Sequence, residues 1–115
     1  MDRARAAELL ARERARVERA LAELGEREDA GELSHLDQHP ADYASELFDA
    51  QLEEGLAERL REELKAIERA EMRLEDDTYG QSIESGEPIP DARLELIPWA
   101  ERTTEEQAAF ERLSG

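Results

Sequence analysis

A short stretch of this sequence gathers four side chains that can bind a metal ion or exchange a proton. They are His35, Asp37, His39 and Asp42. Imidazole and carboxylate groups suit zinc or manganese, so a metal site is one interpretation. Helix capping and contacts within a turn are commoner uses of these residue types. We favour these uses because the stretch crosses a predicted turn, and we expect no metal there.

Catalysis has little support elsewhere in the chain. The sequence contains no cysteine, which excludes disulfides and thiolate metal sites. It has no glycine-rich phosphate loop, and its carboxylates have no predicted apolar pocket that would tune them for proton transfer. We therefore interpret the chain as a binding protein and not as an enzyme.

The residues before the His/Asp stretch predict a long helix over 2–27. Its apolar side chains recur at steps of three, four and seven residues, which places them on one face; they are Ala6, Leu10, Val17, Leu21 and Leu24. Strong helix formers fill most other positions. Gly31 is expected to end this helix, so that residues 28–40 form a connection, and Pro40 suits the first turn of the helix that follows.

A second, longer helix is predicted over 41–77. Its apolar stripe consists of Ala44, Phe48, Leu52, Leu56, Leu60, Leu64, Ile67, Ala70 and Leu74. Part of this stripe keeps the seven-residue step of a coiled coil. Because the connection is short, we expect the two helices to pair antiparallel. The pair would hold a tip near residues 29–45 away from the rest of the chain.

Residues 78–115 break this pattern with several glycines and prolines and predict a compact, turn-rich module. Its core candidates are Ile83, Ile89, Leu94, Leu96, Ile97 and Trp99. A last helix is predicted over 103–113, with Thr103 or Thr104 as its cap and Glu106 or Gln107 completing a capping box. The predicted fold class is mainly α: a long antiparallel coiled-coil hairpin (1–77), then a small globular module with a C-terminal helix (78–115).

The formal net charge of −16 is distributed unevenly. Residues 1–28 hold seven arginines and seven acids, whereas residues 28–58 hold ten acids and neither Lys nor Arg. Such a field repels DNA and anionic lipid, so we expect no direct DNA binding and no membrane binding. It would be attracted to a basic surface or to bound divalent cations, unless it serves only solubility. No stretch resembles a membrane span or signal peptide, so we expect a cytoplasmic monomer.

Ten residues of the module keep the spacing of a known motif. The motif reads Tyr-Gly-x-Cys-x-x-Cys-Gly-x-x-Ile-Pro-x-x-Arg-Leu, followed by Pro-x-Ala and by Cys-x-x-Cys-Gln. The matching residues are Tyr79, Gly80, Gly86, Ile89, Pro90, Arg93, Leu94, Pro98, Ala100 and Gln107. In these residues the chain resembles the zinc-finger type of the DksA/TraR family of RNA polymerase regulators.

The resemblance implies a zinc finger whose ligands have been replaced. The four cysteine positions hold Ser82, Ser85, Thr103 and Glu106. Hydroxyl groups are poor zinc ligands, and one carboxylate cannot replace four thiolates. Because zinc supplies much of the folding energy of such modules, this one must rely on apolar packing, turns and hydrogen bonds. We expect no cofactor, zinc included.

The resemblance also implies bacterial RNA polymerase as the partner. The coiled coil of this protein would enter the secondary channel of the polymerase. There its acidic tip would approach the Mg²⁺-containing catalytic centre and shift the populations of promoter complexes. The family's tip pattern is Asp-x-x-Asp-x-Ala-Ser; Asp42, Ala44 and Ser45 match it, His39 stands at the first Asp, and Asp37 lies two residues earlier. The alternative is a scaffold protein that kept the fold and docks another partner through its helical surfaces.

Overall fold

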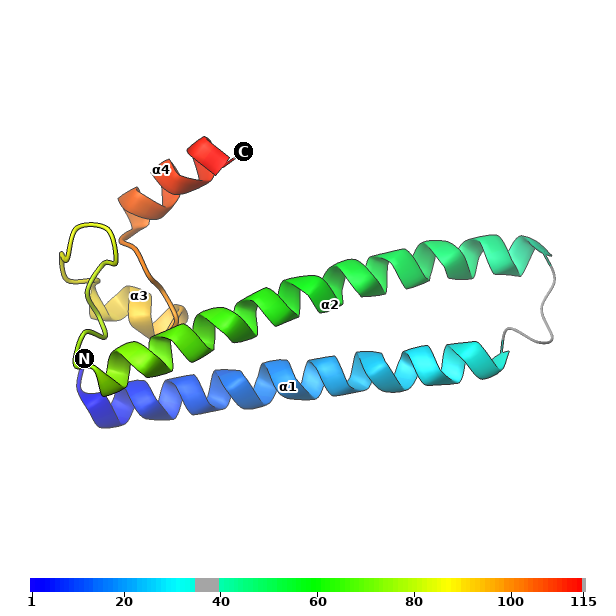
Figure 1. The fold of residues 1–115 in the computed structure, drawn as a ribbon, viewed down its shortest axis with the longest axis horizontal. Helices are drawn as coiled ribbons and strands as arrows, with labels where there is room; N and C mark the ends of the chain where they lie inside the picture. The colour runs from blue at the N-terminus through cyan, green and yellow to red at the C-terminus, as the bar shows by residue number, and fades with distance from the viewer. Residues whose placement is uncertain (35–39, 115) are drawn as a thin grey trace. The chain divides into compact units, whose positions relative to one another are not determined.

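The protein is mainly helical, as predicted. The computed structural model describes residues 1–34 and 40–114, and the side chains of residues 1–26 and 49–114. In order, the helices of this part of the chain are α1 (Arg3–Ser34), α2 (Pro40–Glu75), α3 (Asp91–Leu96) and α4 (Thr104–Ser114) (Figure 1). The only β-type pairing among the described residues is one isolated bridge between Gln81 and Pro88. None of these helices is long and apolar enough to cross a lipid bilayer.

The chain forms two compact units. The first consists of Met1–Arg14 and Lys65–Gly115, and the second of Ala15–Leu64. Each unit therefore contains a stretch of α1 and a stretch of α2. The predicted domain boundary between residues 77 and 78 stays a prediction.

The ends of the long helices differ in part from the prediction. α1 continues to Ser34 and so passes through Gly31, where we expected it to end. The prediction was wrong because one glycine costs a helix only about 1 kcal/mol relative to alanine, and strong helix formers flank this one. α2 begins at Pro40, as predicted, and ends at Glu75.

In the first unit, α1 and α2 lie side by side and run in opposite directions (Figure 1). Arg3 pairs with Asp77 at 3.2 Å, and Arg14 pairs with Glu71 at 2.5 Å, so residue numbers rise along one helix as they fall along the other. The apolar side chains buried along both helices of this unit are Ala6, Leu9, Leu10, Ala66, Ile67 and Ala70. These observations confirm the antiparallel helical hairpin.

Among the described side chains of the second unit, four apolar ones are buried: Val17, Leu24, Ala57 and Leu60. Leu52 and Leu56, which we expected in the buried stripe, are 59% and 46% exposed. Steps of four residues advance a position by about 40° around a helix with 3.6 residues per turn. A stripe built only from such steps therefore drifts off the buried face, and Ala57 is buried in place of Leu56.

The end of α2 is shaped by a residue in the left-handed region. Asp77 has φ 60°. The Thr78 N–H donates to the Arg73 carbonyl at 2.9 Å, and the Asp77 N–H donates to the Leu74 carbonyl at 3.4 Å. This is the Schellman pattern, which satisfies the last carbonyls of a helix and turns the chain sharply. The chain then continues into the loop of residues 78–90, which belongs to the first unit.

The core of the module is a cluster of Ile89, Leu94 and Ala100, with Met1, Tyr79 and Ile97 partly buried against it. Ile83 and Leu96 were predicted core residues, but they are 49% and 81% exposed. Leu94 lies in α3, a helix of 6 residues that we did not predict from the sequence. Leu96 is two positions further on, about 200° around that helix from Leu94, so it points away from the core.

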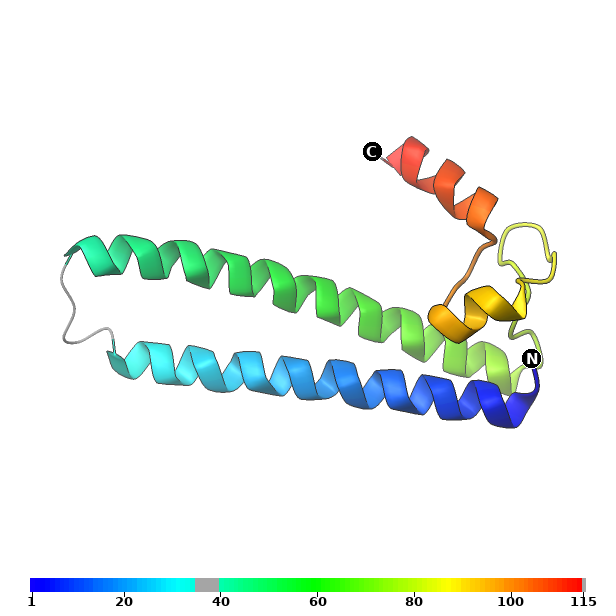
Figure 2. The ribbon, with the colours of Figure 1, turned by 180° about the vertical axis from the view of Figure 1, so that it is seen from behind.

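Polar contacts reinforce this packing. The Tyr79 hydroxyl donates to the Pro98 carbonyl at 2.8 Å, and burial raises the pKa of Tyr79 to about 12. Arg5 of α1 donates two hydrogen bonds, of 3.1 and 2.8 Å, to the Glu95 carboxylate of α3. The module is thereby tied to the N-terminal end of α1, as Figure 2 shows.

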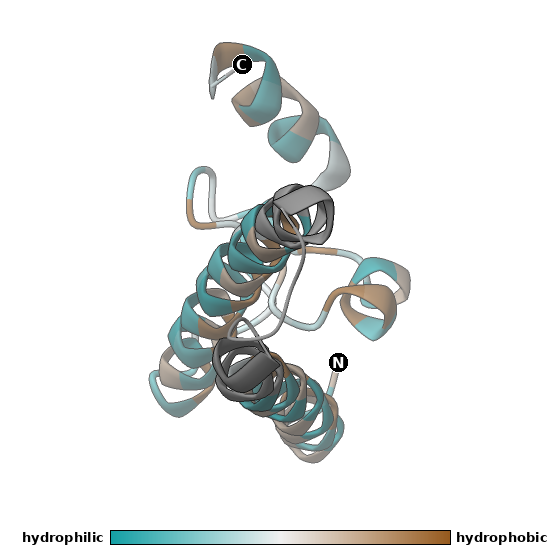
Figure 3. Cartoon of the chain, turned by 90° about the vertical axis from the view of Figure 1, so that its right-hand side faces the viewer, coloured by the Kyte–Doolittle hydropathy of each residue, from teal (hydrophilic) through white to brown (hydrophobic). Residues whose placement is uncertain are grey.

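α4 differs from the other helices because none of its residues is buried. Hydrophobic and hydrophilic positions alternate along it (Figure 3). Phe110 is 41% and Leu113 is 90% exposed. The Arg102 guanidinium lies 3.8 Å from the centre of the Phe110 ring, a cation–π contact that links α4 to the segment before it.

Candidate functional site

The predicted tip falls partly outside the described residues. His35, Asp37 and His39 lie in the segment 35–39, which the structure does not describe. Asp42, Ala44 and Ser45 lie in α2 close to its N-terminal end. The role of these residues as a polymerase-acting tip, and the alternative metal site, remain predictions.

The four positions that the resemblance aligns with zinc ligands come from two segments of the first unit. Ser82 and Ser85 belong to the loop after α2, and Thr103 and Glu106 stand at the start of α4. The Thr103 N–H donates to Glu106 Oε1 at 2.9 Å, and the Glu106 N–H donates to Thr103 Oγ1 at 3.3 Å. This reciprocal pair is the capping box expected at this helix, so that prediction is confirmed.

The serine side chains organise the loop that carries them. Ser82 Oγ accepts hydrogen bonds from the N–H groups of Glu84 and Ser85, at 3.1 and 3.3 Å. Ser85 Oγ accepts one from the Glu87 N–H at 3.2 Å. The Ser82 main chain also bonds to Glu87, which closes a tight turn. Although Ser82 is a polar residue, it is buried.

The neighbours of Glu106 favour its ionised form. Hydrogen bonding from the Ser85 side chain, the Thr103 backbone and the Ser82 side chain lowers the pKa of Glu106 to about 2. Donors that bond to the ionised form of a carboxyl group stabilise that form. Glu106 is therefore expected to stay charged at neutral pH.

The donor atoms at the four aligned positions, Ser82, Ser85, Thr103 and Glu106, do not fit zinc. Structural zinc sites use thiolates and imidazoles, whereas these positions offer three neutral hydroxyl groups and one carboxylate. Among the described residues, no group of three or more His, Cys, Asp or Glu side chains is placed to hold a metal ion. The side chains at these positions are thus poor zinc ligands, and the absence of zinc from the module stays a prediction.

A second polar cluster, which sequence reasoning missed, is centred on Glu101. Its carboxylate accepts two hydrogen bonds of 3.0 Å from Arg69 and one of 3.3 Å from Arg73, both on α2. The hydrogen bonds from Arg69 hold the pKa of Glu101 below its usual value, while burial lowers the pKa of Arg73. Arginine remains charged under ordinary conditions, so the ion pairs persist at neutral pH.

The Glu101 cluster docks the module onto α2. The Glu101 and Arg73 side chains are 16% and 15% exposed, so both charges are largely removed from water. The sequence contains two signals that could have indicated the Glu101 cluster. Arg69 and Arg73 are four residues apart on a predicted helix and so share a face. Glu101 is an isolated acid directly after an apolar segment.

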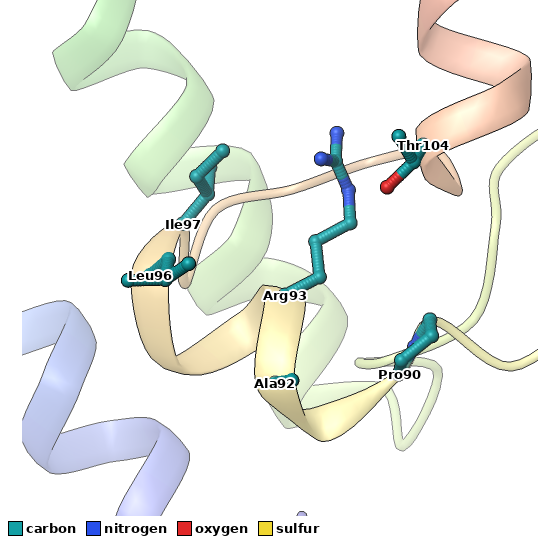
Figure 4. A pocket seen from close by; sticks show the side chains of 6 residues that line it. All are labelled: Pro90, Ala92, Arg93, Leu96, Ile97 and Thr104. Carbon is teal, nitrogen blue, oxygen red and sulfur yellow. The ribbon is translucent and has the colours of Figure 1, made fainter.

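A shallow hollow lies between α3 and the start of α4 (Figure 4). Its lining is mainly apolar and consists of Pro90, Ala92, Arg93, Leu96, Ile97 and Thr104. Arg93 Nε donates to the Arg102 carbonyl at 2.9 Å, which fixes the arginine along one wall. Leu96 contributes a highly exposed apolar side chain, so this is a surface for contact and not a closed cavity.

Comparison with known proteins places the chain in a class of small helical proteins with a zinc-finger module. The model of the prokaryotic dksA/traR C4-type zinc finger matches residues 83–112. The solved structure of the transcription factor DksA2 from Pseudomonas aeruginosa is 32% identical, with a TM-score of 0.58, over 93% of this chain and 86% of that one. The chain belongs to the DksA/TraR family.

Two curated relatives extend this comparison. The general stress protein 16O of Bacillus subtilis is 39% identical, over 73% of this chain and 52% of its own length. The RNA polymerase-binding transcription factor DksA of Caulobacter vibrioides is also 39% identical, over 75% of this chain and 65% of its own length. The chain thus spans between about half and two thirds of the length of these two proteins.

Proposed function

We propose that this protein is a transcription regulator that binds bacterial RNA polymerase. In this proposal the hairpin enters the secondary channel, and the tip residues Asp37, His39, Asp42, Ala44 and Ser45 act on promoter complexes. The observation that carries the proposal is the likeness to DksA2 over most of both chains. The Caulobacter vibrioides relative, an RNA polymerase-binding transcription factor, supports the same partner.

The charge distribution supports this mode of action. Ten acids without a Lys or Arg lie between residues 28 and 58, around the predicted tip. Such a field favours an approach to a basic channel that holds Mg²⁺ and opposes binding to DNA. The protein would regulate by favouring one state of a promoter complex over another, and no bond would be made or broken by its own residues. We accordingly propose a cytoplasmic, cofactor-free monomer that is not an enzyme.

The first test is direct binding to bacterial core polymerase. We expect saturable binding that a known secondary-channel ligand competes away. Shortening α1 and α2 by seven residues each would keep the helical register and should abolish the effect of the tip. Binding that persists in the presence of excess competitor would contradict entry into the channel.

The second test separates binding from action at the tip. Asp42→Ala should change the lifetime of promoter complexes at least several-fold and leave the affinity for polymerase nearly unchanged. The matched control is Asp49→Ala, which removes an exposed carboxylate seven residues further along α2 and should leave the lifetime as it is. Equal lifetimes for wild type and Asp42→Ala would show that the tip is assigned wrongly.

His39 permits a test in the opposite direction. It stands where the family pattern has its first Asp, so His39→Asp restores an acidic pair around the start of α2. If charge at the tip acts on the polymerase, this variant should strengthen whatever effect the wild-type protein has on promoter complexes. An unchanged effect would mean that the charge at this position does not matter.

A second candidate function rests on the exposed apolar side chains. Leu52 and Leu56 of α2 and Leu96 beside the hollow are each 46% or more exposed. Such side chains, when they gather, suit protein contacts, so the protein could serve as a scaffold for another partner. Affinity capture with wild type and with Leu96→Ser would distinguish the two: a specific non-polymerase partner lost with Leu96→Ser would favour the scaffold.

A further inference from the structure

We propose that Gly25 and Gly55 form a hinge in the helical hairpin, at which its end bends as one body. Both glycines lie in the second unit, Gly25 in α1 and Gly55 in α2, and each interrupts a run of strong helix formers. Glycine gives a helix backbone freedom that no other residue provides. A hairpin needs this freedom in both helices at the same level, because a stiff helix would splint the one beside it.

The two glycines lie at nearly the same level of the hairpin. An ion pair between Arg16 and Glu63 fixes the alignment of α1 and α2 in this unit. The helices run antiparallel (Figure 1) and rise equally per residue. Counting nine residues from each partner toward the end of the hairpin therefore reaches Gly25 on α1 and Glu54 on α2. Gly55 is the next residue, so the glycines lie within about one helical turn of each other along the hairpin.

Packing within the hairpin requires neither glycine. A Cβ added at Gly25 or Gly55 would meet no other part of the described chain within 4 Å. Close contact with a single partner does not explain the pair either, because the glycines lie on different faces. Gly55 is two residues, or about 200°, from the buried Ala57, whereas Gly25 is one residue, or about 100°, from the buried Leu24. Backbone freedom at one level is the property that the two positions share.

The described contacts at this level offer little resistance to bending. Beyond the glycines, the described side chains are those of Glu26 and residues 49–54, and none of them is buried. The ion pair of Glu54 and Arg61 spans Gly55 along α2. Both of its side chains are more than half exposed, and an exposed pair contributes little to stability. The hairpin can therefore bend here without disrupting a described core contact.

The first experiment measures residual dipolar couplings of the helical amides in the free protein. Hinge motions on the μs–ms timescale average these couplings. The amides of residues 26–34 and 41–54 should therefore be less strongly aligned than those of residues 15–24 and 56–64. One alignment that fits both sets would show a rigid hairpin and would overturn the proposal. The measurement needs no partner, so its outcome is independent of the proposed function.

The second experiment stiffens one helix at a time. Gly25→Ala and Gly55→Ala each add helix propensity without a steric clash. In a shared hinge, Gly55→Ala should raise the alignment of α1 amides 26–34 as well as that of its own helix. Gly25→Ala should likewise raise the alignment of α2 amides 41–54. Effects confined to the substituted helix would mean that each glycine loosens only its own helix, which contradicts a hinge.

Amide hydrogen exchange gives the size of the effect and its control. Either alanine should slow exchange beyond the glycines about fivefold in both helices, the factor that corresponds to the difference in helix propensity between glycine and alanine. Arg59→Ala is the matched control, because it places an alanine at an exposed position one turn from Gly55 and removes no glycine. It should leave the couplings and the exchange nearly unchanged. An effect as large as that of Gly55→Ala would assign the change to general helix propensity and refute the hinge.

Discussion

The two units of this protein stabilise the same pair of helices in different ways. The first unit has buried apolar side chains such as Leu10, a module core and the largely buried pair of Glu101 and Arg73. In the second unit, the described residues include the exposed Leu52 and Leu56 and an ion pair between exposed groups, Arg61 and Glu54. We therefore expect changes at these positions of the second unit to cost less stability than changes in the core of the first.

The largest difference is expected when apolar side chains are truncated. Leu10→Ala in the first unit removes a side chain that is only 1% exposed and should reduce the free energy of unfolding by about 2–5 kcal/mol. Leu56→Ala in the second unit should change it by less than about 1 kcal/mol. Urea denaturation followed by circular dichroism would measure both. Similar losses would remove the distinction between the units.

The loss of an ion pair should also cost more unfolding free energy in the first unit than in the second, but the difference should be smaller than for apolar side chains. Glu101→Ala leaves Arg73 largely buried without its carboxylate and should cost about 1–3 kcal/mol of unfolding free energy. Glu54→Ala in the second unit breaks a pair with Arg61 in which both side chains are more than half exposed, so its cost should stay below about 1 kcal/mol. Urea midpoints would decide, and a large cost at Glu54 would contradict the comparison.

Acid should weaken the first unit through the same carboxylates. The folded-state pKa values of Glu101 and Glu106 lie below the ordinary 4.5, that of Glu106 at about 2. A depressed pKa contributes stability that is complete above the unfolded value and is lost as the pH falls through the folded value. Trp99 fluorescence should therefore report loosening of the module between about pH 4.5 and pH 2. Glu106→Gln should show a smaller dependence on pH in this range.

The smallest effect, and one of opposite sign, is expected at Gly55. It lies in α2 within the second unit, and an added Cβ would have no atom within 4 Å. Gly55→Ala should therefore stabilise the protein by about 0.5–1 kcal/mol through helix propensity. Gly80→Ala is the contrasting variant, because Gly80 has φ 85°, and it should destabilise the first unit. Thermal midpoints of the two variants should move in opposite directions.

Local rules predicted much of the fold. Apolar periodicity predicted both long helices, and the short connection predicted their antiparallel pairing. Capping chemistry predicted a helix over 103–113 capped by Thr103 or Thr104, and α4 begins at Thr104. Leu52 and Leu56 were mispredicted because burial depends on how far a stripe drifts around its helix. Leu96 was mispredicted because the helix that turns it away from Leu94 was not foreseen. The short helix α3 is stabilised by the burial of Leu94, a tertiary effect that single-sequence propensity does not capture.

The candidate site was predicted only where residues close in sequence act together. Thr103 and Glu106 are three residues apart, so their reciprocal hydrogen bonds follow from a local motif. Glu101, in contrast, bonds to Arg69 and Arg73, which lie 32 and 28 residues before it in the sequence. Sequence spacing gives no information on pairs so far apart.

The two attachments of Glu101 determine how the module can detach from α2. Its carbonyl accepts the Ile83 N–H at 2.9 Å, while its carboxylate holds Arg69 and Arg73. The loop and the helix thus share one residue as their attachment point, so neither can separate fully while the other stays bound in place. Hydrogen exchange of the Ile83 amide should then require the rarer, cooperative detachment of the whole module. Although the Ile83 side chain is half exposed, its amide should be among the slowly exchanging amides of the loop.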